Sequence, residues 1–485
     1  MSLIKMPVNN SAKQNTPIDL PILTFAKRTF LLISSSAIRL AVQLTVIFLY
    51  ARNLSYTDYG LYQSAWLYVN VISVISIFGL PSLILSSAAN NIKIWMTHHK
   101  KLFISVGLAV NIIPIIYLLF TGKNYDSITK ILLIAISIVQ NISIIAEIFA
   151  IKKEKEKLVL VTNIIFSAGY LFCHLFLLYS SYSLQLLLSG IIMLYILKAV
   201  LLWIFSNVMA HKENAAPALS TGKQWFYLGL NDVLGIIFKW LDKWVILFFV
   251  SVTEFAVYFN GSYEIPIFGL MLSAAGNIML VELSKANNDG TAKIKSLFEN
   301  SSLLLAAIVF PSFCFLFFYS TEFFTLIFSA KYAASIPVFI ISIFVLPVRI
   351  TYFTAVLQVY HRSDLIVKGA VLDLLVAIVL MAVLYPLLQM EGLALAFVVS
   401  TYVQAGYYLW HTGKIINKKV SYFFPFKKLF MLLVLSAVIT GAGYYLFIFL
   451  SYPVNMILGI ALCVILIAAL LFYYYKAGKK ISLRV

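Results

Sequence analysis

Apolar stretches of about 20 residues recur along almost the whole chain and are separated by short polar segments. A stretch of that length lets an α-helix cross the hydrocarbon core of a bilayer. The pattern predicts about fourteen membrane-spanning helices, at residues 29–50, 60–85, 102–120, 130–150, 158–179, 185–206, 225–250, 255–281, 301–320, 333–356, 366–387, 392–411, 429–449 and 454–475. We therefore expect an all-α integral membrane protein whose loops are too short to fold as separate domains.

Two turns between these helices have nearly the same sequence. Residues 55–62 read Ser-Tyr-Thr-Asp-Tyr-Gly-Leu-Tyr, and residues 251–258, 196 positions later, read Ser-Val-Thr-Glu-Phe-Ala-Val-Tyr. A Ser or Thr with a neighbouring acid just before an apolar run is typical of a helix start, where the side chains bind free N–H groups. The repetition predicts an internal duplication, with one copy of the turn in each half.

The polar segment from Ser206 to Lys223 lies between the sixth and seventh predicted helices and is the natural linker between the halves. The expected domains are a cytoplasmic segment (1–28), a six-helix bundle (29–206), a linker (207–224), a second six-helix bundle (225–412) and a C-terminal helix pair with its tail (413–485). Because each half starts on the same side, the repeat is parallel, and transporters of this design bind substrate between the halves.

Composition and charge support a membrane protein. The chain is 62% hydrophobic and 11% charged, which excludes an ordinary soluble globule, and its net charge is +18. With a cytoplasmic N-terminus, one side of the membrane holds most Lys and Arg, and the other holds only Arg52, Lys123, Lys130 and Lys331. This asymmetry predicts that both termini are cytoplasmic, and it explains the charge without a nucleic-acid partner. Three isolated cysteines indicate neither a disulfide framework nor a metal site.

Ionisable side chains inside the predicted spans are the candidate functional residues, because charge at membrane depth is costly. Arg39 and Gln43 share a face of the first helix, and Lys239 and Lys243 share a stripe of the seventh; the repeat offset places Gln43 and Lys239 at equivalent positions. With Arg349 of the tenth helix, these residues are candidates for binding an anionic headgroup.

The carboxylates in the spans are candidates for coupling transport to an ion gradient, since burial favours their neutral form. They are Glu147, Asp232, Asp242, Glu264 and Asp373. Together with Lys198, the spans carry five residues of each sign, so the interior is not simply cationic. The structural alternative is that Asp242 pairs with Lys239 or Lys243 and that the other charges hold helices together.

Several of these segments resemble one family. Residues 52–62 resemble the turn after the first helix of bacterial polysaccharide exporters of the Wzx type. Gly79-Leu80-Pro81-Ser82 is similar to the motif that ends their second helix, and Leu241-Asp242-Lys243 to the Asp-Lys pair of their seventh. Residues 391–396, Glu-Gly-Leu-Ala-Leu-Ala, resemble the start of their twelfth helix, although Ala256 stands where the second turn is expected to have Gly.

This resemblance implies two six-helix bundles around a central cavity, in a superfamily shared with MATE multidrug exporters and lipid II flippases. It implies alternating-access transfer of an undecaprenyl-diphosphate-linked oligosaccharide, such as an O-antigen repeat unit, from the inner to the outer leaflet of the bacterial cytoplasmic membrane. No enzymatic activity and no cofactor are expected, and coupling to H⁺ or Na⁺ is open. A polysaccharide polymerase and chain-length machinery are candidate partners.

Two alternatives are weighed against this hypothesis. A cation-coupled MATE-type drug exporter would have the same fold, but such exporters have twelve helices, and Lys239 and Lys243 suit a cationic ligand poorly. A membrane polymerase or ligase of glycan assembly would carry a large external loop with catalytic Arg or His, and the predicted external loops are short.

Overall fold

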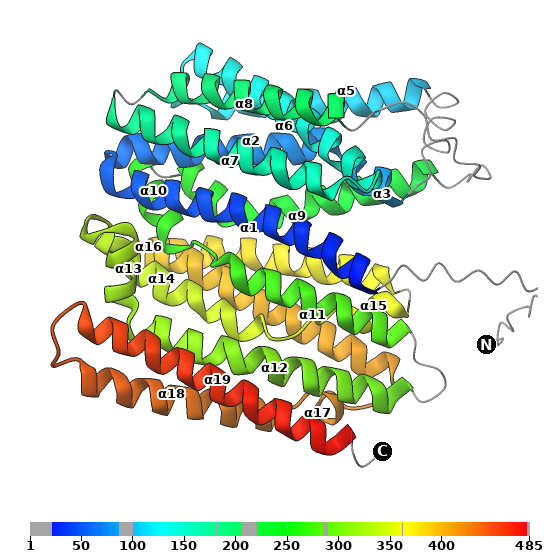
Figure 1. The fold of residues 1–485 in the computed structure, drawn as a ribbon, viewed down its shortest axis with the longest axis vertical. Coiled ribbons are helices and arrows are strands. Elements are labelled where there is room, and N and C mark those ends of the chain that lie inside the picture. The colour runs from blue at the N-terminus through cyan, green and yellow to red at the C-terminus, as the bar shows by residue number, and fades with distance from the viewer. Residues whose placement is uncertain are drawn as a thin grey trace, which may run out of the picture. The chain divides into compact units, whose positions relative to one another are not determined.

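The computed structural model describes residues 22–86, 100–180, 183–205, 221–249, 251–284, 290–360 and 362–482, and these residues contain helices but no strand. Its helices, shown in Figure 1, are α1 (Ile22–Asn53), α2 (Tyr56–Ile77), α3 (Leu80–Ser86), α5 (Lys100–Thr121), α6 (Ser127–Lys152), α7 (Glu156–Tyr179), α8 (Leu184–Phe205), α9 (Thr221–Phe249), α10 (Val252–Gly261), α11 (Pro266–Ser284), α12 (Gly290–Phe318), α13 (Ser320–Phe328), η1 (Ala330–Ser335), α14 (Ile336–Ser342), η2 (Ile343–Val348), α15 (Ala355–Val359), α16 (Ser363–Ile415), α17 (Val420–Phe423), α18 (Phe426–Phe447) and α19 (Val454–Ser482).

Eleven helical segments among the described residues are long and apolar enough to cross a membrane. Large apolar side chains on their outer faces are exposed, including Phe120 at 75% and Leu446 at 71%. A soluble protein does not expose so much apolar surface, so these faces are suited to lipid. The predicted class, an all-α integral membrane protein, is confirmed, whereas the number of fourteen spans stays a prediction.

The chain forms two compact units. The first comprises Met1–Val46, Gly79–Ala109 and Ile134–Leu228, and the second comprises Ile47–Phe78, Val110–Leu133 and Gly229–Val485. In the first unit, α7 and α8 pack along each other, and Ala146, Ala150, Val159 and Leu202 form a small core. The predicted domain limits are based on the order of the helices along the chain, whereas these units are compact groups of residues. The limits therefore stay a prediction.

The second unit has a larger apolar core that draws on α2, α9, α10, α14 and α16. The C-terminal helices α18 and α19 lie beside each other and against α12 in this unit (Figure 1). A β-carbon on Gly441 would lie 2.9 Å from the Phe318 ring, and one on Gly459 would lie 2.5 Å from the Tyr319 ring. Glycine therefore permits the close approach of this pair to α12, as small residues commonly do between membrane helices.

Three spans that the sequence pattern predicts as continuous are interrupted. The 60–85 span breaks at Phe78 and Gly79, whose φ angles are 37° and 71°. The 255–281 span breaks between α10 and α11, and Pro266, which has no N–H to donate, begins the new helix. The 333–356 span consists of η1, α14, η2 and α15, with Pro347 inside η2 and residues 349–354 outside any helix.

The predicted spans 366–387 and 392–411 are the two arms of α16. The only non-helical residue in α16 is Gln389, with φ 49° and ψ −125°. The chain reverses there, since the Tyr408 hydroxyl donates a hydrogen bond to the Ile366 carbonyl at 3.0 Å. A β-carbon on Gly392 would lie 2.4 Å from the Leu384 carbonyl oxygen, so this tight reversal requires glycine.

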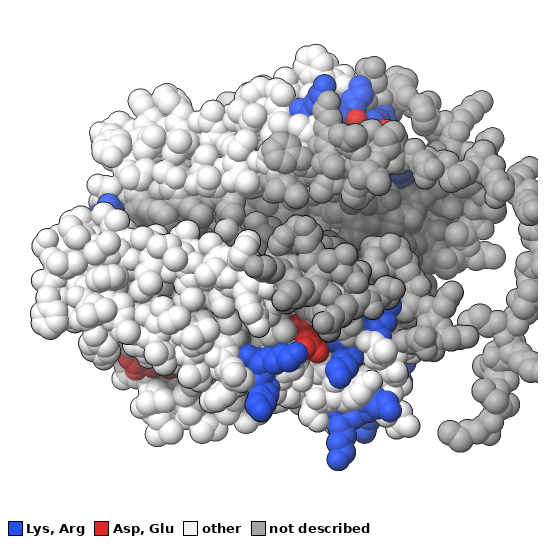
Figure 2. Space-filling model, turned by 60° about the horizontal axis from the view of Figure 1, so that its bottom comes forward, with Lys and Arg blue, Asp and Glu red and all other residues white. Residues whose placement is uncertain are grey.

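Basic side chains of the second unit gather toward one end of its helices, next to a broad area without charge (Figure 2). Lys414, Lys418, Lys419, Lys427 and Lys428 are exposed around α17 at the end of α16 and the start of α18. Lysines at the ends of apolar helices reach the polar edge of a bilayer. The sequence predicts that this end faces the cytoplasm, and that orientation of the protein stays a prediction.

Candidate functional site

The repeated turns both begin helices, as their sequences predict. Ser55 precedes α2, and its hydroxyl oxygen accepts a hydrogen bond from the Asp58 amide at 3.0 Å. Ser251 precedes α10, where its hydroxyl oxygen accepts from the Glu254 amide at 3.2 Å and Glu254 accepts from the Ser251 amide at 3.3 Å. The second turn is therefore a complete capping box.

The two turns also contact each other inside the second unit, which the sequence comparison does not predict. A β-carbon on Gly60 would lie 2.3 Å from the Val252 carbonyl oxygen, so α2 and α10 approach closely only because this residue is glycine. The buried Tyr59 hydroxyl donates to Asn260 Oδ1 at 2.7 Å and accepts from Gln63 Nε2 at 2.7 Å. A buried hydrogen-bonded chain thus joins the helices that the two copies of the repeat begin.

Basic residues hold the helix ends around this contact. Arg52 donates to the Leu326 carbonyl in the last turn of α13, and Lys331 donates to the Leu54 carbonyl just after α1. The Lys331 ammonium also lies 4.7 Å from the Tyr56 ring centroid. Cations stabilise the carbonyl ends of helices, so these two residues have a structural role.

The first unit contains a charged cluster made by α1, α6, α7 and α8. Glu147 Oε2 accepts from Lys198 Nζ at 2.6 Å and from Arg39 Nη1 at 3.5 Å. Asn163 Nδ2 lies 3.2 Å from Glu147 Oε1 and 2.7 Å from Ser35 Oγ. One carboxylate therefore balances two cations, and the cluster carries a surplus positive charge.

The two cations of this cluster differ in exposure. The Lys198 side chain is only 4% exposed and lies against Glu147, whereas the Arg39 side chain is 35% exposed. Gln43, one turn along α1, is exposed as well. Arg39 is the cation of this cluster that a ligand could reach, and Glu147 is occupied as the structural partner of Lys198.

In α9 the two predicted lysines have different environments. Lys243 Nζ lies 2.8 Å from Asp242 Oδ2, which also accepts from the Tyr258 hydroxyl at 2.9 Å, and all three residues are buried. Asp242 therefore pairs with Lys243 and not with Lys239. Lys239 is exposed, has no carboxylate within salt-bridge distance among the described residues, and its ammonium lies 5.3 Å from the Trp240 ring centroid.

Arg349 and Glu264, predicted to have separate roles, form an ion pair at 2.8 Å in the second unit. Asp373 in α16 and Asp232 in α9 are half-buried. Of these carboxylates, Glu147, Asp242 and Glu264 each hold a cation, whereas Asp373 is in no ion pair among the described residues.

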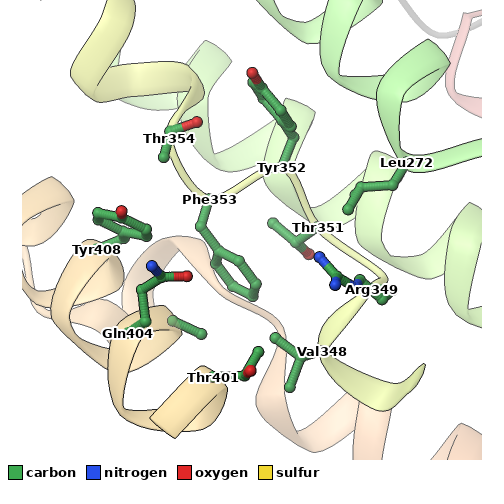
Figure 3. Close-up of a pocket in the computed structure, with 11 residues that line it drawn as sticks. Leu272, Val348, Arg349, Thr351, Tyr352, Phe353, Thr354, Thr401, Gln404 and Tyr408 are labelled. Atoms are coloured by element: carbon green, nitrogen blue, oxygen red, sulfur yellow. The ribbon is translucent and has the colours of Figure 1, made fainter. Parts of the chain in front are cut away.

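A cavity of about 140 Å³ lies beside Arg349, where the helix containing η2 ends (Figure 3). It is lined by Leu272, Val348, Arg349, Thr351, Tyr352, Phe353, Thr354, Thr401, Gln404, Ala405 and Tyr408. Among the described residues, no group of three or more His, Cys, Asp or Glu side chains could hold a metal ion.

The candidate residues named from the sequence omit several neutral polar groups of these sites. Asn163 and Tyr258 complete the two ion-pair clusters, and Gln404 lines the cavity. The signal for Asn163 and Gln404 is a carboxamide within an apolar helix, which is costly at membrane depth for the same reason as a charge. A search that starts from ionisable residues overlooks these two.

The interrupted membrane helices and the ion pairs held within them define a polytopic membrane protein of the kind that carries polar ligands. Residues 49–337 match the family described as polysaccharide biosynthesis protein, so the chain belongs to that family. The family resemblance found in the turn motifs is thereby confirmed. No curated protein matches the chain.

Solved structures show the same fold. Lipid II flippase MurJ in an inward closed conformation is 14% identical, with a TM-score of 0.66 over 93% of this chain and 99% of that one. A MOP superfamily transporter from Pyrococcus furiosus is 13% identical, with a TM-score of 0.55 over 83% and 99%. An outward-facing MATE family transporter of the same superfamily is 12% identical, with a TM-score of 0.52 over 81% and 96%. At these identities the likeness establishes the fold alone.

Proposed function

We propose that the protein is a flippase that moves an undecaprenyl-diphosphate-linked oligosaccharide between the leaflets of the bacterial cytoplasmic membrane by alternating access. Membership of a polysaccharide biosynthesis family supports a glycan substrate. The fold, shared with a protein described as a lipid II flippase, supports movement of a lipid-linked headgroup. Such a headgroup needs a polar path, because its exposure to hydrocarbon is prohibitively costly.

The observation that carries this proposal is the accessible positive charge in each unit. Arg39 is half-buried, and it is the more exposed of the two cations that share Glu147 in the first unit. Lys239, in the second unit, is exposed and is not ion-paired with any residue in the described part of the chain. Guanidinium and ammonium groups bind phosphate oxygens, so each of these residues is a proposed phosphate-binding group of its own unit. Lys243 and Arg349 have carboxylate partners and are assigned a supporting role.

Asp373 is the proposed coupling residue, because it is half-buried in α16 and forms no ion pair with any residue that the structure describes. A carboxylate without a bound cation can take up a proton or a sodium ion during the cycle. Both termini are proposed to be cytoplasmic, and the polymerase and chain-length machinery remain proposed partners. No step of this function forms or breaks a covalent bond.

The test is leaflet translocation of a fluorescent undecaprenyl-diphosphate oligosaccharide in proteoliposomes. We expect wild-type protein to translocate the lipid and Lys239→Ala to slow it at least about tenfold, since the lost contact is charge-assisted. Lys123→Ala, which removes an exposed lysine from the loop after α5, is the matched control and should translocate normally. Lys243→Ala is a poor test because it leaves the buried Asp242 carboxylate without its cation.

Absence of translocation by folded wild-type protein with any of several glycans would contradict the flippase proposal. If the same vesicles showed proton- or sodium-driven efflux of organic cations, the drug-exporter alternative would replace it. Equal rates for wild type and Lys239→Ala would keep the flippase and remove Lys239 from the substrate path.

A further inference from the structure

The interrupted helix of the second unit has a non-helical segment within the span that the sequence pattern predicts at 333–356. Residues 349–354 lie outside any helix, between η2 and α15. Membrane proteins tolerate such backbone only where it is buried in protein or lines a polar cavity, and broken helices commonly mark ligand sites. The segment is held to α12 by Ser302, whose hydroxyl lies 2.5 Å from that of the buried Thr351.

The cavity beside this segment is small. Its volume is about 140 Å³, whereas pockets for drug-sized ligands have about 300–1,000 Å³. One water molecule takes up about 30 Å³ in the liquid, so the cavity has room for a few waters or one small ring. It cannot hold an oligosaccharide or a polyprenyl chain.

One side of the cavity carries the side-chain amide of Gln404. Gln404 is half-buried in α16, and its side chain makes no hydrogen bond to any residue that the structure describes. An amide offers two N–H donors and one acceptor, which are costly to leave unused at this depth. The Thr354 hydroxyl accepts from Gln358 Nε2 at 3.2 Å, which leaves its own hydrogen available.

An aromatic ring forms the other side. Phe353 is half-buried, and Figure 3 shows its ring between the Gln404 amide and the Arg349 guanidinium. An aromatic face packs against apolar C–H groups, whereas an amide and a hydroxyl bind hydroxyl groups. A sugar ring presents both kinds of surface, with C–H groups on its faces and hydroxyls around its edge.

The local charges favour an uncharged ligand over a phosphate. Arg349 is paired with Glu264 at 2.8 Å, so its charge is already balanced by a carboxylate. Among the described residues that line the cavity, Arg349 is the one cation. A phosphate would therefore find no unpaired cation here, unlike at Lys239.

We propose that this cavity binds one uncharged sugar ring of the lipid-linked glycan, with Gln404 bonding its hydroxyls and Phe353 packing on its C–H face. The inference rests on the proposed flippase function and divides the headgroup between two kinds of site. Accessible cations bind the diphosphate, and the cavity selects the sugar. Gln404 and Phe353 are then residues that determine which glycan is carried.

The test compares two kinds of lipid bound to protein in nanodiscs: undecaprenyl diphosphate alone, and undecaprenyl diphosphate bearing glucose, galactose or N-acetylglucosamine. We expect wild type to bind at least one sugar-bearing lipid about tenfold more tightly than the sugarless one, as a satisfied amide–hydroxyl contact allows. Gln404→Leu should abolish this preference and leave the affinity for undecaprenyl diphosphate unchanged. Gln140→Leu in α6 is the matched control, because Gln140 is also half-buried and its Oε1 has no partner.

The sugar site would be overturned by a wild-type protein without a sugar preference, or by a Gln404→Leu protein that keeps the preference. In either case, binding of undecaprenyl diphosphate would still support the flippase. Failure of wild type to bind any polyprenyl diphosphate would instead overturn the proposed function. If Gln404→Leu does not fold, Phe353→Leu replaces the ring with an apolar side chain and carries the same expectation.

Discussion

At the scale of single residues, most charges within the spans are in ion pairs. The pairs distinguish residues with a structural role from those that a ligand can reach. Glu147 with Lys198 and Asp242 with Lys243 are within 2.8 Å of each other and largely buried, whereas the Glu264 and Arg349 side chains, also 2.8 Å apart, are 52% and 34% exposed. A buried pair costs desolvation energy and stabilises the fold only weakly, but loss of one partner strands the other. The first pair joins α6 to α8, and the second, within α9, contacts α10 through the Tyr258 hydroxyl. Lys239, outside these pairs, is accessible to a ligand.

This argument predicts the response of the cluster in the first unit to substitution. Glu147→Gln should destabilise the protein by about 3–5 kcal/mol, because the buried Lys198 ammonium loses its carboxylate. The double variant Glu147→Gln/Lys198→Met should recover much of that loss, since it removes the stranded charge. Thermal unfolding in detergent measures both. The exposed pair of Arg362 and Asp364 provides the control, and Asp364→Asn should change the midpoint little. A double variant as unstable as the single one would contradict the argument.

At the scale of elements, the contact between α2 and α10 depends on the absence of one side chain. Gly60→Ala would place a β-carbon 2.3 Å from the Val252 carbonyl oxygen, which is backbone and cannot rotate away. We expect a loss of about 1–3 kcal/mol, as for other overpacked sites. Gly269→Ala in α11 meets nothing within 4 Å and should be neutral or slightly stabilising because alanine favours a helix. Equal unfolding midpoints for the two variants would show that α2 and α10 do not pack as described.

The elements also show how far the sequence can predict this fold. Helix type, the two capped turns and the approximate spans follow from residue pattern alone, because lipid imposes helix length and Ser55 and Ser251 mark helix starts. The exact positions of the breaks at Phe78 and at residues 349–354 do not, since Gly79, Pro81 and Pro347 permit a break nearby but tertiary contacts decide where the backbone leaves the helix. The ion-pair partner of Asp242 cannot be predicted from the sequence either, because Lys239 and Lys243 are both within reach of it along the helix. Only the packing distinguishes them.

At the scale of the whole molecule, the asymmetric distribution of basic residues predicts its orientation in the membrane. Lys123 lies in the exposed loop between α5 and α6, where basic residues are few, and Lys419 lies in the lysine-rich segment before α17. Lysine and arginine are retained on the cytoplasmic side, so these loops should face opposite compartments. The same distribution places both termini in the cytoplasm.

Cysteine labelling in intact cells tests this orientation. A membrane-impermeant maleimide should label Lys123→Cys before lysis and Lys419→Cys only after it. The unsubstituted protein sets the background, because its own cysteines, Cys173, Cys314 and Cys463, are half-buried or buried within helices. The reverse labelling order would show that the topology is inverted. The 140 Å³ cavity, in the part of the second unit nearer the α17 end, would then face the outer side, and its sugar would be bound at release instead of at loading.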